Sequence, residues 1–343
     1  MQNWKFSQII INWQHYFGRN NLPWQKNNNP YYIWISEIML QQTQVKTVIP
    51  YFNKFITQFN NIKSLSKSNL NKILYLWSGL GYYNRANNIY KTAKIIINNY
   101  NGNFPNNFNN LIKLPGIGKT TAHAILSLSY NFSFPILDGN VKRILIRFYN
   151  LKIENSKKKI NENKLWKIIN QITPIHNAKK FNQGMMDLGA LICTYKKPKC
   201  YICPLKNSCQ YDNTINIQKN IKKNKIKKKT IFYMILQYKN FIVFENRKKR
   251  IWNKLFCFPE FNNLKEMQYW LLKNNIFNFN YKKYFYKIHK LSHLKIKMIF
   301  INIKIKKKIK ININKNKCWY NLKKKIHIGI PKPIYDIIIQ LHK

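Results

Sequence analysis

Apolar residues recur every three or four positions through most of the first two hundred residues. The spacing is clearest in Leu70–Trp77, Ala122–Leu128 and Val141–Tyr149. This period is typical of helices with one buried face, so we expect residues 6–211 to be largely helical. Prolines punctuate the pattern at positions expected to be helix starts or loops, namely Pro30, Pro50, Pro105, Pro115, Pro135 and Pro174.

The pattern changes in the last third of the chain. Thr230–Tyr238 and Phe241–Phe244 predict two strands joined by a Lys239-Asn240 turn, and Ile296–Ile305 and Ile309–Ile313 continue the β-rich character. We therefore expect a separate, smaller α+β domain over residues 230–343.

A lysine-rich stretch separates these two regions. Residues 213–229 contain seven lysines and no acidic residue, so this stretch is too polar to bury a core. The predicted organisation is a helical region over residues 1–212, a basic linker over 213–229 and the second domain over 230–343.

The formal net charge of +51 over 343 residues makes a polyanion the expected partner. Nucleic acid comes first and an anionic membrane second. Lys, Asn and Ile crowd the whole chain, which indicates a biased nucleotide composition, and we assign roughly half of the excess charge to that drift. No apolar run approaches the ~20 residues that span a membrane, and the N-terminus lacks a leader pattern, so we expect a soluble intracellular protein. We also expect it to act as a monomer in the cytoplasm.

Four of the six cysteines lie within one short stretch: Cys193, Cys200, Cys203 and Cys209. Four thiolates at this spacing suit zinc or an iron–sulfur cluster in a reducing compartment better than disulfides do. Only one pair, Cys200 and Cys203, is separated by two residues, which favours the iron–sulfur cluster over zinc. Four protein ligands leave no open position for substrate, so we expect a structural role.

Carboxylates are scarce, and the first two along the chain stand out. Glu37 is the one acidic residue among the first 137 positions, and Asp138 is the next. Shortly before Asp138, Gly116 and Gly118 lie in the segment Leu114–Ala122. Two glycines allow a tight turn between helices, and free N–H groups at the following helix start can bind a DNA phosphate without reading sequence.

Taken together, these features resemble the helix-hairpin-helix DNA glycosylase superfamily with an iron–sulfur cluster. Within that superfamily, four further blocks resemble the adenine DNA glycosylases, which remove adenine mispaired with 8-oxoguanine. These blocks are Leu22–Trp24, Trp34–Val45, Leu76–Ala86 and Met185–Ala190. The resemblance implies a [4Fe-4S] cluster held by the four cysteines and a substrate of double-stranded DNA with A:8-oxoguanine or A:G mispairs.

The resemblance implies roles for both carboxylates. Adenine leaves more readily when it is protonated, and a carboxyl in a partly dry pocket has the raised pKa needed, so Glu37 is expected to be the general acid. Asp138 is expected to stabilise the oxocarbenium-like sugar, with Asn140 as a supporting hydrogen-bond partner. On a helix, Glu37, Gln41 and Gln44 share one face at spacings of four and seven, so we expect the acid and an amide to point into the same cleft.

Other residues follow from the same resemblance. Glu162 is expected to contact the extruded adenine. Tyr82 is expected to be the aromatic wedge that replaces lost stacking, and Gln42 to fill the vacated space. Related enzymes that also cut the strand carry a lysine where this chain has Thr120, and Lys119 is one residue out of register. We therefore expect base removal without efficient strand cleavage.

The second domain resembles the lesion-recognition domain of the family, which is itself similar to Nudix hydrolases. Trp252–Glu260 occupies the place of that fold's first conserved loop, but the metal-binding glutamate cluster is missing, so we expect recognition and no hydrolysis. The family reads 8-oxoguanine with Phe-Ser-His, and this chain has Leu291 followed by Ser292 and His293.

Two alternatives remain beside an adenine glycosylase. One is a bifunctional glycosylase and lyase for oxidised pyrimidines, against which Thr120 and the second domain argue. The other is a DNA-binding module that has lost catalysis, against which the retention of Glu37 and Asp138 argues.

Overall fold

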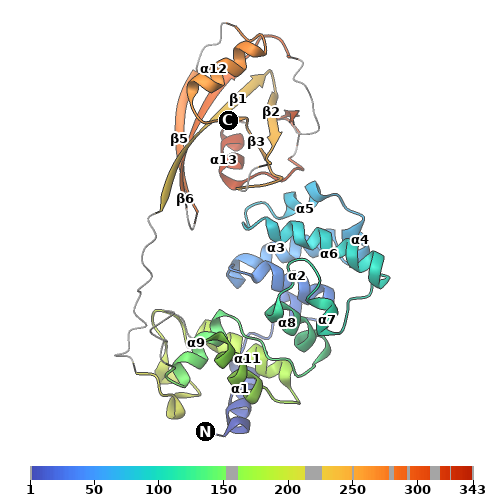
Figure 1. The fold of residues 1–343 in the computed structure, drawn as a ribbon, viewed down its shortest axis with the longest axis vertical. Coiled ribbons are helices and arrows are strands. Elements are labelled where there is room, and N and C mark those ends of the chain that lie inside the picture. Colours follow the sequence, from blue (N-terminus) through green and yellow to red (C-terminus); the bar gives the residue numbers. More distant parts are fainter. Residues whose placement is uncertain are drawn as a thin grey trace. The chain divides into compact units, whose positions relative to one another are not determined.

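A computed structural model of the protein describes residues 2–151, 161–212, 226–248, 251–277, 282–291, 294–309, 317–324 and 326–341. The chain forms two compact units (Figure 1). Unit 1 comprises Met1–Lys67 and Asn88–Gln218, and unit 2 comprises Ser68–Asn87 and Lys219–Lys343. The grouping of residues 68–87 with the C-terminal residues differs from the boundary that the sequence pattern suggested.

The described part of unit 1 is helical, as the 3.6-residue period predicted. Helix α6 (Asn84–Tyr100) begins in unit 2 and continues in unit 1. The other elements of unit 1 are α1 (Asn3–Phe17), η1 (Pro23–Gln25), α2 (Pro30–Leu40), α3 (Val45–Gln58), α4 (Ile62–Ser66), α7 (Phe108–Leu111), α8 (Lys119–Tyr130), α9 (Gly139–Phe148), α10 (Glu162–Ile172), α11 (Ala178–Leu191), η2 (Cys200–Ile202) and η3 (Lys206–Ser208).

Asparagine side chains begin many of these helices. Asn29, for example, accepts a hydrogen bond from the Tyr31 N–H at the start of α2, where Pro30 occupies the first helical position. An asparagine N-cap satisfies an amide that the helix itself leaves unpaired. The same arrangement starts α4, α5 (Leu70–Leu76), α7, α10 and α12 (Leu264–Lys273).

One of the proline predictions was wrong. Pro50 lies inside α3 rather than at a helix start or in a loop. Its ring is on an exposed face of the helix, where the carbonyl that loses its amide partner can bind water instead.

The core of unit 1 is built from α1, α9, α10 and α11. Phe6, Val141, Ile169 and Phe181 are among its buried side chains, and three cysteines of the later loop pack against it. A smaller cluster joins α2 to α8 through Ile33 and Ala124. The two clusters fix α2, α8 and α9, which are the elements that carry both candidate catalytic carboxylates and the hairpin.

The described residues of unit 2 form a seven-stranded sheet; Figure 1 labels its strands β1, β2, β3, β5 and β6. Its main strand order is β3-β2-β1-β6-β5, with β4 paired to β1 and β7 paired to β2. Strands β1 and β6 are parallel, whereas the other pairs are antiparallel. The elements are β1 (Lys227–Tyr238), β2 (Phe241–Asn246), β3 (Phe256–Cys257), β4 (Glu260–Phe261), β5 (Lys282–Lys290), β6 (Leu294–Lys304), β7 (Lys317–Asn321), α5, α12 and α13 (Lys332–Leu341).

The predicted β1–β2 hairpin is confirmed. Tyr238 pairs with Phe241, and Lys239 adopts a left-handed conformation in the turn between them. Strand β1 begins at Lys227, inside the stretch that we expected to be linker, and the remainder of that stretch, residues 213–225, lies outside the described residues. Ile309 is not in a strand, and residues 310–313 are also outside the described part.

The described helices include none that is long and apolar enough to cross a membrane.

Candidate active site

Glu37 lies on the buried helix α2. Its neighbours Trp34 and Ile38 are almost fully buried, and Glu37 as a whole residue is half-buried. Burial, together with the negative charge of Asp138, raises the pKa of Glu37 to about 7. A carboxyl with this pKa is half-protonated near neutrality, which is the state that a general acid requires.

The predicted helical face beyond Glu37 was wrong. Helix α2 ends at Leu40, Gln41 is its C-cap, and Gln44 is the N-cap of α3. Gln42 adopts a left-handed conformation that a continuous helix does not allow. Gln41 nevertheless reaches the hairpin, where its amide lies 3.5 Å from the Gly116 carbonyl oxygen and 3.4 Å from the Thr121 hydroxyl.

Asp138 is the N-cap of α9. One carboxylate oxygen accepts a hydrogen bond from the Val141 N–H at 2.8 Å, and the other accepts one from the Asn140 side chain at 3.0 Å. Burial raises the pKa of Asp138, whereas these bonds and the positive charge of Arg143 oppose that rise. The bonds favour the ionised form, so Asp138 is the carboxylate suited to remain charged while Glu37 holds a proton.

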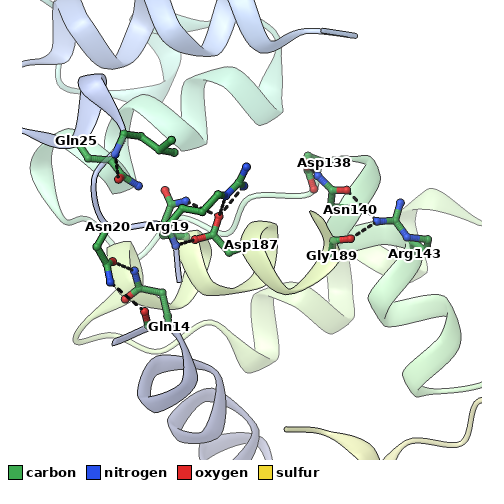
Figure 2. Close-up of polar contacts among 11 residues, drawn as sticks. Gln14, Arg19, Asn20, Gln25, Asp138, Asn140, Arg143, Asp187 and Gly189 are labelled. Carbon is green, nitrogen blue, oxygen red and sulfur yellow. Dashed lines mark hydrogen bonds and ion pairs between the residues drawn. The ribbon is translucent and has the colours of Figure 1, made fainter. Parts of the chain in front are cut away.

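Arg143 braces the Asp138 cap, a role that the sequence analysis missed. Its guanidinium donates to the Asn140 side chain at 2.9 Å and to the Gly189 carbonyl at 2.7 Å (Figure 2), and to the Cys193 carbonyl at 2.7 Å. A continuous chain of hydrogen bonds therefore links the cysteine loop to Asp138. The signal available was spacing, since residues 140 and 143 share one helical face.

Helix α11 supports the same region by close packing. A Cβ on Gly189 would lie 2.6 Å from the Cβ of Asn140, so the two helices approach more closely than any larger residue permits. The buried Asn182 accepts from the Ile136 N–H and donates to the Phe134 carbonyl. The segment that leads to Asp138 is thereby fixed on both sides.

A third carboxylate, Asp187, is fully buried and has a structural role. It accepts hydrogen bonds from the Arg19 backbone and guanidinium at 2.7 and 2.8 Å (Figure 2) and from Gln183 at 2.9 Å. The Asp187 side chain is 0% exposed. The ion pair therefore joins the segment after α1 to α11, and it was not predicted from the sequence.

We expect Asp187→Asn to destabilise the protein by about 2 kcal/mol, because it weakens charge-assisted hydrogen bonds at a fully buried position and leaves the partly exposed Arg19 cation without its partner charge. The shift of the urea unfolding midpoint would measure this loss. Glu162→Gln is the matched control, since the pair of Glu162 with Lys142 is on the surface and its removal should cost under about 1 kcal/mol. Equal effects of the two changes would contradict the assignment.

The predicted hairpin is present between α7 and α8. Gly116 has φ +83°, and a Cβ there would lie 2.9 Å from Asn88, so both conformation and space call for glycine. Gly118 is the exposed N-cap of α8. The Thr120 hydroxyl lies 3.4 Å from the carbonyl oxygen of Leu137, next to Asp138, whereas the Lys119 amine lies 4.0 Å from the centre of the Trp166 ring.

The other residues predicted to contact DNA are spread over both units, and two of them lie outside the described residues. Glu162 is exposed at the start of α10 and pairs with Lys142 at 2.8 Å, which lowers the pKa of Glu162. Gln42 is exposed in unit 1. Tyr82 belongs to unit 2, where it is 52% exposed in a left-handed conformation. Ser292 and His293 lie outside the described residues.

The four cysteines follow α11 as half-buried free thiols. Burial raises the pKa of Cys203 to about 11, and the other three sulfurs add to the rise, so all four influence one another's charge. Arg147 lies 3.3 Å from the Cys193 sulfur. No three His, Cys, Asp or Glu side chains of the described residues form a site for a single metal ion. The chemistry of this donor set, four thiols in one loop, suits an iron–sulfur cluster.

Comparison with known proteins shows which family the chain belongs to. The family model of the HhH-GPD superfamily base excision DNA repair proteins matches residues 35–171. The chain is 52% identical to the adenine DNA glycosylase of Buchnera aphidicola subsp. Acyrthosiphon pisum, over 100% of this chain and 99% of that protein. It is 54% identical to that of Buchnera aphidicola subsp. Baizongia pistaciae, over 98% and 97%. The chain belongs to the adenine DNA glycosylase family.

A solved structure agrees with this assignment for the helical region. A thermostable thymine-DNA glycosylase matches with a TM-score of 0.55 at 29% identity, over 61% of this chain and 95% of that one. The enzyme is thus an adenine DNA glycosylase of base excision repair with a helical HhH-GPD fold and a C-terminal α+β region. The full-length similarity favours neither an oxidised-pyrimidine lyase nor a DNA-binding module without catalysis.

Proposed function

We propose that the enzyme removes adenine mispaired with 8-oxoguanine or guanine, using Glu37 as general acid and Asp138 as the group that stabilises the sugar cation. The observation that supports these roles most is the difference between the two carboxyls. Glu37 has a pKa of about 7, while Asp138 accepts two hydrogen bonds that favour its ionised form. One group can give a proton while its neighbour stays charged.

The proposed reaction breaks the bond between the sugar C1′ and the adenine nitrogen. Glu37 donates its proton to a ring nitrogen of adenine, so that the electron pair of the broken bond leaves on a neutral base. The sugar becomes cationic at C1′ and is stabilised by the Asp138 carboxylate. Water then adds at C1′ and its proton goes to a carboxylate, which leaves an abasic site.

DNA would be held by the hairpin and by residues around the flipped base. The exposed Gly118 N-cap and the turn at Gly116 can approach a phosphate closely. In this proposal Tyr82 replaces the stacking lost on extrusion, Gln42 fills the vacated space, and Glu162 contacts the adenine.

The remaining parts would support binding. Cys193, Cys200, Cys203 and Cys209 would hold a [4Fe-4S] cluster, which when bound would supply a rigid structural centre with no open coordination position. The C-terminal α+β region would be a Nudix-like domain that recognises 8-oxoguanine through Ser292 and His293. The site of action would be the DNA of a bacterial cytoplasm.

The deciding experiment is single-turnover excision, with alkali-revealed cleavage, on matched duplexes carrying adenine opposite 8-oxoguanine, guanine or thymine. We expect fast loss of adenine opposite 8-oxoguanine and slow or no loss opposite thymine. Equal rates opposite 8-oxoguanine and guanine would show a working glycosylase that does not read the lesion. Absence of excision from all three duplexes would refute the proposed substrate.

We also expect the enzyme to leave the DNA strand intact. Thr120 lacks the amine needed for a Schiff base, and Lys119 is directed onto the Trp166 ring. Borohydride should trap less than a few per cent of the enzyme on DNA, and Lys119→Gln should not change that amount. Strong strand cleavage without heat or alkali, abolished by Lys119→Gln, would contradict this expectation.

A further inference from the structure

Residues Ser68–Asn87 belong to the same compact unit as the C-terminal strands. The segment begins with α5 and continues through a turn in which Gly79, Gly81 and Tyr82 all have positive φ. Tyr82, the proposed wedge, is therefore part of unit 2 rather than of the unit that carries Glu37 and Asp138. This arrangement raises the question of what fixes the Tyr82 turn.

One end of the segment is held by the chain just before α13. The Ile330 N–H donates to the Ser78 hydroxyl at 3.3 Å, and the rings of His327 and Tyr75 meet edge to face at 5.7 Å. A Cβ on Gly329 would lie 2.5 Å from the Cβ of Leu74 on α5. The two backbones thus pack as closely as a glycine allows.

The same glycine is tied to the sheet. The Gly329 carbonyl accepts a hydrogen bond from the Phe256 N–H of β3 at 2.9 Å. A Cβ at residue 329 would also lie 3.0 Å from Leu255, which is fully buried. Gly329 is therefore contacted by the loop before β3 on one side and by α5 on the other.

The other end of the segment is set by an internal brace. Trp77 Nε1 and Arg85 Nη2 both donate to the Gly81 carbonyl at 3.1 Å. The Arg85 guanidinium lies 5.4 Å from the centre of the Tyr82 ring and 5.5 Å from that of Trp77. These contacts fix the backbone beside Tyr82 and one side of its ring, while about half of the side chain stays exposed.

We propose that the C-terminal part of unit 2, which carries the sheet and α13, positions the Tyr82 wedge through α5. Ser78 and Gly329 are the positioning residues. The inference rests on the proposed role of Tyr82 in base extrusion. A displacement of the 326–330 segment or of the loop before β3 moves α5, and the braced turn carries Tyr82 with it. The part of the chain expected to open the duplex is then positioned by the strands and loops of the domain expected to read the lesion.

The test uses the full-length enzyme with Ser78→Ala, Gly329→Ala and Tyr82→Ala, and Asn71→Ala on the exposed face of α5 as the matched control. Ser78→Ala removes only a hydroxyl and keeps the fold even if Gly329→Ala is too disruptive. Two substrates separate extrusion from chemistry: a mispaired adenine, and an adenine opposite an abasic-site analogue that is already unpaired. A 2-aminopurine beside the target adenine reports unstacking on binding without any cleavage.

We expect the positioning variants to slow excision of the mispaired adenine about tenfold and to weaken the 2-aminopurine signal, while the unpaired adenine changes by less than about twofold. Tyr82→Ala should give the same pattern, and Asn71→Ala should match the wild type. Wild-type behaviour of Ser78→Ala and Gly329→Ala beside a slow Tyr82→Ala would overturn the inference. Equal losses on both substrates would overturn it too, because they indicate damage to the chemical step.

These results are distinguishable from failure of the proposed function. If the wild type removes no adenine, the proposed reaction fails, yet the 2-aminopurine signal still tests positioning. If the wild type is active and Tyr82→Ala is normal in both readouts, the wedge role fails and the inference falls with it.

Discussion

Glu37→Gln is expected to lower the single-turnover rate of adenine excision by about 10³-fold, because glutamine keeps the shape of the side chain but carries no proton to donate. DNA binding should be nearly unchanged, since the substitution removes no cation. Quench-flow excision and a filter-binding titration would measure the two quantities. Glu266→Gln is the matched control, since it makes the same chemical change at an exposed position on α12 that the proposed reaction does not use.

The pH dependence tests the same residue independently. In the proposed mechanism Glu37 acts in its protonated form, and its pKa is about 7, so the excision rate should fall about tenfold per unit above pH 7. At acidic pH the rate should fall as well, because Asp138, whose pKa burial raises, then becomes protonated. A rate that rises from pH 7 to pH 9 would show that Glu37 acts as a base or not at all.

The free energy of unfolding of Glu37→Gln, compared with that of the wild type, should also depend on pH. The folded enzyme holds the Glu37 proton up to about pH 7, whereas the unfolded chain releases it near about pH 4.3. The stabilisation from proton retention is complete below pH 4 and is lost as pH rises to 7. Glu37→Gln should therefore unfold at a higher urea concentration than the wild type at pH 8 and at a similar concentration at pH 4.

Asp138→Asn is the second change with a large expected effect. Asparagine caps a helix as well as aspartate does, so α9 should persist and the unfolding midpoint should move little. The negative charge that we propose stabilises the sugar cation is lost, which should reduce excision by about 10²- to 10³-fold. Single-turnover kinetics and urea unfolding on the same preparation would separate the two effects.

The same variant should also alter Glu37. The Asp138 charge contributes to the raised pKa of Glu37, so its removal lowers that pKa. The residual excision of Asp138→Asn should therefore begin to decline at a lower pH than wild-type excision does. An unchanged pH profile would show that the two carboxyls do not interact.

Much of the helical region could be predicted from the sequence because its signals are local. The 3.6-residue period predicted α5, α8 and α9, and the two glycines predicted the hairpin. The end of α2 at Leu40 was missed, because Gln42 has no side-chain feature that announces a left-handed conformation. The periodic pattern of apolar residues indicates which side chains are buried, but it does not reveal a left-handed conformation at one residue.

The site was predicted less completely than the fold. Glu37 and Asp138 stood out because carboxylates are scarce in this chain. Arg143 and Arg19 did not, because they are two among sixty-one cations and their partners are far away in sequence. The grouping of α5 with the C-terminal strands depends on contacts across about 250 residues, as between Ser78 and Ile330, which no local pattern encodes.

The asparagine caps bear on how such a chain tolerates compositional drift. A bias that replaces alanine with asparagine weakens helix interiors, where asparagine is a poor helix former. The same replacement is favourable one residue before a helix, as at Asn29, Asn61 and Asn107. The drift thus moves helix stability from the middle of each helix to its first turn, so the folding of this chain should depend unusually strongly on where its asparagines stand rather than on how many it has.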